Sequence, residues 1–70
     1  MSVDISIDEI RQDIRDTEAE IAQMKREEMG FRLIGDRMSI FRADARASGI
    51  KERMEFIAKL RNILFERGEL

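Results

Sequence analysis

The chain has 70 residues, a formal net charge of −2, and neither cysteine nor histidine. These absences exclude disulfide bonds, thiolate nucleophiles, imidazole bases and the zinc sites that require such ligands. A single domain of this size buries only about 60% of the surface that its unfolded chain exposes, so we expect residues 1–70 to need self-association for stability.

The first predicted helix begins at a capping box near the N-terminus. Ser6 stands three residues before Glu9 in the stretch "DISIDEI", so its hydroxyl can accept a hydrogen bond from the backbone N–H of Glu9. Proline is absent, and most of the remaining residues are strong helix formers. The sequence therefore predicts an all-α protein.

Apolar residues recur in this helix at alternating spacings of three and four residues. Such spacing is typical of the a and d positions of a coiled coil, and it predicts the side chains that pack in the core or in a dimer interface. In the first helix these side chains are Ile7, Ile10, Ile14, Ile21, Met24, Phe31, Ile34, Met38 and Phe41. Isoleucine occupies the a positions up to Ile21, but Glu28 and Arg42 occupy later ones. Beyond Ile21 the apolar residues beside the d positions therefore lie on the other flank of the helix.

The length of the first helix decides the predicted topology. We expect it to run from about residue 7 to residue 47, which is about 60 Å at 1.5 Å per residue. Ser48 and Gly49 then supply a turn, and a second helix of about 27 Å follows over residues 50–67. The alternative is a three-helix bundle broken near Gly30. We favour the long helix because a glycine inside a helix costs only about 1 kcal/mol.

Both predicted helices carry more apolar surface than one neighbour covers. The second helix presents a broad apolar face formed by Met54, Ile57, Leu60 and Leu64. The later half of the first helix has a second apolar stripe, on the face opposite its predicted core side chains, and this stripe contains Met29, Leu33 and Ile40. We therefore expect this helical hairpin to dimerise into a coiled-coil-like four-helix bundle.

Three arginines share one flank of the predicted long helix. Arg32, Arg42 and Arg46 follow helical spacing between the two apolar stripes. A row of guanidinium groups can clamp the carboxylates of a partner, contact phosphates, or line the edge of a bundle and pair with acidic residues of a second copy. The predicted partner-binding surface combines these arginines with Met29, Leu33 and Ile40. Nucleic acid is the weaker alternative ligand, because the chain is net acidic and has no Tyr or Trp for stacking.

Several kinds of site and segment are missing from the sequence. The stretch "GFRLIG" lacks the spacing of a phosphate-binding loop, and carboxylates at helical spacing fall on an outer, solvated face. We expect no catalytic residues, metal, cofactor or small-molecule substrate. No apolar run approaches the roughly 20 residues that cross a bilayer, and the N-terminus is acidic where a signal peptide is basic. We therefore expect a cytoplasmic protein with no membrane contact.

The run "IDEIRQDIRDTEAEIAQMKREEMGFRLIGDRM" resembles the first helix of the all-helical chorismate mutases. The resemblance implies that Arg11 binds a substrate carboxylate from the neighbouring subunit, that Arg26 does so within the chain, and that Arg37 takes the place of the usual lysine. It covers residues 7–38, is one residue short before the "IG" pair, and lacks counterparts for the functional residues of the family's second helix and for its third helix. A helical enzyme of this kind is a further alternative function.

The sequence as a whole favours a small non-catalytic interaction module. We expect a homodimer that binds another protein through helical surfaces and acts as a regulator, adaptor or inhibitor, of the sort found among compact mobile-element and phage proteins.

Overall fold

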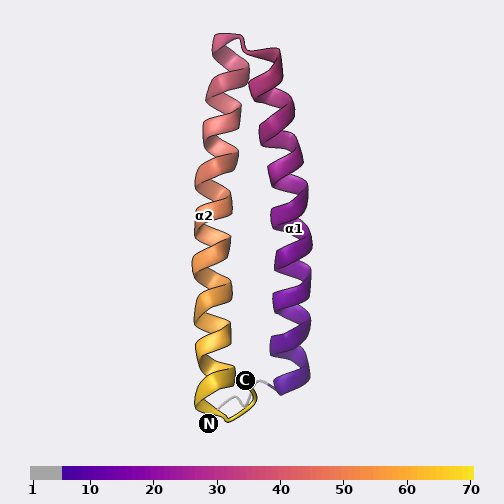
Figure 1. Ribbon diagram of the computed structural model, residues 1–70, viewed down its shortest axis with the longest axis vertical. Helices are drawn as coiled ribbons and strands as arrows, with labels where there is room; N and C mark the ends of the chain where they lie inside the picture. The colour runs from indigo at the N-terminus through magenta and orange to yellow at the C-terminus, as the bar shows by residue number, and fades with distance from the viewer. Residues whose placement is uncertain (1–5) are drawn as a thin grey trace.

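The protein folds into an antiparallel hairpin of two long helices (Figure 1), seen in a computed structural model that describes residues 6–70. Helix α1 spans Ile7–Ile34 and helix α2 spans Arg37–Glu66, and they form a rod of 49 × 19 × 17 Å. The all-α helical hairpin that the sequence predicts is confirmed.

The start of α1 follows the predicted cap. The Ser6 hydroxyl oxygen accepts a hydrogen bond from the backbone N–H of Glu9 at 3.1 Å. This bond satisfies one of the N–H groups that have no partner in the first turn of a helix.

Two residues reverse the chain between the helices. Gly35 ends α1 in the left-handed conformation with φ 77°, and its N–H donates to the Phe31 carbonyl at 3.2 Å. Asp36 directly afterwards caps α2, because its carboxylate accepts from the N–H of Ser39 at 2.7 Å. The C-cap of α1, Gly35, is thus followed directly by the N-cap of α2, Asp36.

The predicted long first helix, about 7–47, with a turn at 48–49 and a second helix at about 50–67, is therefore wrong. The chain turns at Gly35 and Asp36, whereas Ser48 and Gly49 lie inside α2. The physical reason is that Gly35 and Asp36 together satisfy both helix ends, while Gly49 alone costs α2 only about 1 kcal/mol. A three-helix bundle broken near Gly30 is also wrong, because Gly30 lies inside α1.

The core is a single seam of aliphatic side chains between the two helices. Its buried members are Ile10, Ile14, Ile21, Ile50, Ile57, Leu60 and Leu64, with Ile7, Met24 and Ile63 packed against them. Ile10 is the most completely enclosed large side chain, with 1% of its surface exposed. Nearer the turn the seam is made of small residues, because Ser39 and Ala43 are the buried side chains of α2 there.

Four side chains that the sequence predicts for a core or a dimer interface lie outside the core of the hairpin. Ile34, Met38, Phe41 and Met54 are each more than half exposed, and Phe31 is half-buried. The turn at Gly35 interrupts the heptad pattern at residues 34–41, and Met54 lines the groove beside the seam.

Charge supports the pairing of the two helices. Helix α1 carries eight acidic and five basic side chains, and α2 carries four acidic and seven basic ones. Ion pairs between the helices join Glu20 to Arg53, Glu18 to Arg61, Glu27 to Arg46, and Arg32 to Asp44. Within residues 6–70, no helix is both long and apolar enough to span a membrane.

Candidate interaction surface

Large apolar side chains surround the turn end of the hairpin. Leu33 is 82% exposed, and the others are 59% to 70% exposed. This turn-end cluster consists of Met29, Leu33, Ile34, Met38 and Phe41. Isolated exposed apolar residues are ordinary on protein surfaces, whereas five large ones lie here within thirteen residues of the chain.

The predicted partner-binding residues contribute unequally to this cluster. Met29 and Leu33 are exposed on the last turns of α1, whereas Ile40 is half-buried on the first turns of α2. The sequence placed the three in one stripe of one helix. The structure brings them to the same end of the hairpin from two helices.

Arg32 is held by two carboxylates of its own chain. It pairs with Glu28 at 2.7 Å and with Asp44 of α2 at 3.2 Å. The hydrogen bond from Arg32 to Glu28 raises the pKa of Arg32 above its usual value. The two ion pairs of Arg32 tie the end of α1 to the start of α2.

Arg42 and Arg46 cover an aromatic ring. Both guanidinium carbons lie 5.9 Å from the centre of the Phe31 ring, within the range of a cation–π contact. Arg46 also pairs with Glu27 at 3.6 Å. These two arginines thus shield the half-buried Phe31 of the opposite helix.

The single arginine flank predicted for a long helix does not form. Arg32 belongs to α1 and Arg42 and Arg46 belong to α2, because the turn lies between them. All three make contacts within the chain, so the structure does not present them as a row of free cations. Nothing in their arrangement favours nucleic acid over a protein partner.

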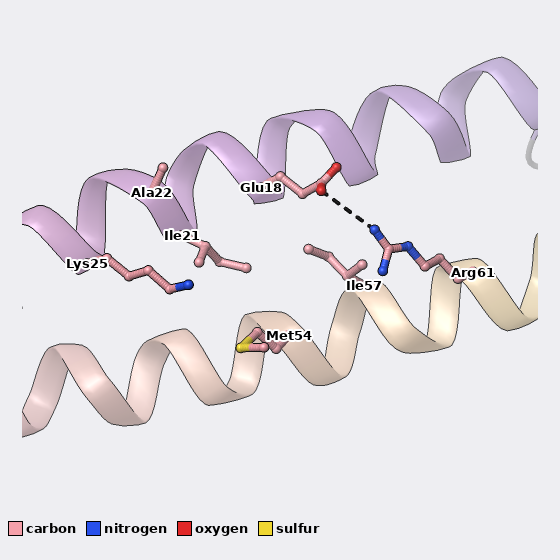
Figure 2. A pocket seen from close by; sticks show the side chains of 7 residues that line it. All are labelled: Glu18, Ile21, Ala22, Lys25, Met54, Ile57 and Arg61. Atoms are coloured by element: carbon pink, nitrogen blue, oxygen red, sulfur yellow. Dashed lines mark ion pairs between the residues drawn. The ribbon is translucent and has the colours of Figure 1, made fainter.

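A shallow groove opens between the helices near the middle of the hairpin (Figure 2). It is an open hollow of about 330 Å³, lined by Glu18, Ile21, Ala22, Lys25, Met54, Ile57 and Arg61. The ion pair between Glu18 and Arg61, at 3.6 Å, crosses one end of it. The floor is apolar and the rim is charged, which suits a packed side chain better than a polar substrate.

Sequence reasoning missed this groove. The signal was present in Ala22 and Met54, which stand beside core positions of their helices. The sequence alone does not predict that these two residues lie near each other, because the register of α1 against α2 depends on the position of the turn at Gly35 and Asp36.

The arginines expected from the chorismate mutase resemblance are not assembled within one chain. Arg11 pairs with Glu69 at the open end of the hairpin, at 3.1 Å, whereas Arg37 begins α2 at the turn end. Arg26 donates to Gln23 of its own helix at 2.6 Å. Among the residues that the structure describes, no group of three or more acidic side chains is placed to hold a metal ion.

In comparisons with protein-family models, with curated proteins and with solved structures, the chain has no significant match.

Proposed function

We propose that the chain is a small non-catalytic interaction module that acts as a homodimer and binds another protein, as a regulator, adaptor or inhibitor. The observation that carries the proposal is the turn-end cluster, in which five large apolar side chains are each at least 59% exposed. Burial of such side chains releases free energy at about 25 cal/mol per Å² of apolar surface. An enzyme of this size would instead need a group of reacting side chains in an enclosed site.

The chemistry around the cluster indicates the kind of partner. Arg37 lies between Ile34 and Met38 in the chain and has no ion pair within residues 6–70. A helix with an apolar stripe and acidic residues beside it would satisfy both the apolar side chains and this guanidinium. We expect the module to act in the cytoplasm, because a chain without cysteine suits a reducing compartment.

Affinity capture from cells that express the chain tests the proposal. The tagged wild-type chain is compared with Leu33→Asp, which places a charge in the cluster without touching the core. Phe56→Asp is the matched control, because Phe56 is 45% exposed on α2 at a distance from the turn. We expect one protein to be captured by the wild type and the control and lost with Leu33→Asp. Equal capture by all three forms, or none by the wild type, refutes binding through the turn end.

A further inference from the structure

The two long sides of the hairpin are built differently. Ion pairs cross the seam on both sides: Glu20 with Arg53 and Glu27 with Arg46 on one side, where arginine also covers Phe31, and Glu18 with Arg61 on the other. The second side carries Glu18 and Lys25 of α1 and Met54 and Arg61 of α2. That second side, the groove face, is open at the groove between α1 and α2 (Figure 2).

The groove face has the side chains of an unfinished helix interface. Ala22 stands at the centre of α1, and Met29 follows one heptad later with 65% of its surface exposed. Ala47 and Met54 are one heptad apart on α2, and Met54 is 55% exposed. Small residues that alternate with methionine allow another helix to approach closely and fill the hollow between α1 and α2.

The elongated shape of the hairpin leaves a large surface exposed. The chain exposes 5501 Å², against roughly 4,500 Å² for a compact globular protein of its mass. The excess of roughly 1,000 Å², which is spread over the whole rod, leaves room for an interface of the roughly 800 Å² that each partner contributes to a stable complex.

Charge along the rod selects the orientation of that copy. The turn half, residues 21–51, has seven basic and four acidic side chains. The open-end half, residues 6–20 and 52–70, has six basic and ten acidic side chains. Two rods packed with their turns at the same end would set like charges together, whereas antiparallel rods set opposite charges together.

We infer that the groove face binds a second copy of the chain, antiparallel to the first, about a two-fold axis that passes beside Ala22. The inference rests on the homodimer proposed above and specifies its face and direction. Glu18 and Lys25 stand about equally far on either side of the axis, so Glu18 of each copy lies opposite Lys25 of the other. Lys25 has no ion pair within residues 6–70. Met29 then lies in the dimer interface, and the other four residues of each turn-end cluster project from opposite ends of the dimer.

Introduced cysteines test this geometry, because the chain contains none of its own. Ala22→Cys should form a disulfide between two copies under mild oxidation. Arg15 and Met29 lie seven residues on either side of Ala22, so a mixture of Arg15→Cys and Met29→Cys chains should cross-link to each other. Met29→Cys alone should not, because its two copies would stand roughly 20 Å apart along the helix axis.

The outcomes separate this inference from the proposed function. A Met29→Cys chain that cross-links to itself, in a sample that sediments as a dimer, overturns the antiparallel order but leaves the homodimer in place. Sedimentation of the wild type as a monomer overturns the inference together with the homodimer, while capture of a partner through Leu33 is measured independently. Circular dichroism first establishes that each variant is folded, and cross-linking is measured afterwards.

A charge reversal gives a second test that needs no oxidation. Lys25→Glu places two carboxylates opposite each other at two symmetric positions, and we expect the dimer dissociation constant to rise roughly tenfold. Lys59→Glu is the matched control, because Lys59 is an exposed lysine of α2 that has no ion pair within residues 6–70 and lies outside the groove lining. Equal dissociation constants for both variants would refute the groove face as the interface.

Discussion

Met24 of α1 occupies the space that a side chain on Gly49 of α2 would need. A Cβ built on Gly49 would lie 2.5 Å from the terminal methyl carbon of Met24. The glycine that the sequence marks as a turn thus lies in mid-helix, where the absence of a side chain lets the two helices approach. The contact with Met24 of the other helix explains why a glycine lies at position 49 inside α2. The sequence of a single helix does not reveal such a contact.

The two mid-helix glycines should respond differently to alanine. Gly30 has no atom within 4 Å of an added Cβ, so Gly30→Ala should raise the free energy of unfolding by about 0.5–1 kcal/mol through helix propensity. Gly49→Ala gains the same propensity but must displace Met24, so its net gain should be smaller or negative. Urea unfolding of both variants measures the difference, and an equal gain would show that the Met24 contact carries no cost.

Gly35 is required by its backbone conformation. Its φ of 77° is unfavourable for any residue with a Cβ. We expect Gly35→Ala to lower the free energy of unfolding by about 1–2 kcal/mol. Gly35→Asn should cost less, because asparagine tolerates the left-handed region. A thermal or urea unfolding series that ranks glycine, asparagine and alanine in this order supports the turn, and an alanine variant as stable as the wild type contradicts it.

The sequence was informative wherever one local interaction decided the structure. The Ser6 cap, the helical composition and the isoleucine spacing from Ile7 to Ile21 need only neighbouring residues, and α1 follows them. The sequence predicts the turn at Ser48 and Gly49 and does not single out Gly35, although either glycine is compatible with a helix end. Asp36 distinguishes them, because an N-cap side chain directly after the glycine starts a new helix.

The error in the turn spread to the predicted site. A helix that continues through Gly35 puts Arg32 and Arg42 on one flank and Ile34 and Phe41 among the predicted core residues. Each pair is divided between α1 and α2 in the hairpin. The exposed apolar surface at residues 29–41 was nevertheless detectable, because those residues had more apolar side chains than one helix could cover.

The cap at Asp36 should make part of the stability depend on pH. The hydrogen bond that its carboxylate accepts from the backbone N–H of Ser39 lowers the pKa of Asp36 below its usual value of 3.8. A group whose pKa is depressed by folding stabilises the fold above its unfolded pKa, and this contribution is lost as the pH falls through the folded value.

Asp36→Asn isolates this contribution, because asparagine also caps helices but does not ionise. We expect the difference in urea midpoint between wild type and variant to favour the wild type more at pH 6 than at pH 2.5. A difference that is constant between the two pH values would show that the Asp36 carboxylate is equally protonated in the folded and unfolded chains.

Truncation of one buried and one exposed aliphatic side chain should separate the core from the turn-end cluster. Ile10 is 1% exposed and Leu33 is 82% exposed. We expect Ile10→Ala to lower the free energy of unfolding by about 2–5 kcal/mol through lost burial and the cavity that remains. Leu33→Ala should change it by less than about 0.5 kcal/mol, because its side chain is already in water. If Leu33→Ala proves as destabilising as Ile10→Ala, Leu33 is buried in the assembled protein, and the turn end belongs to the dimer interface instead of to a surface that is free for a partner.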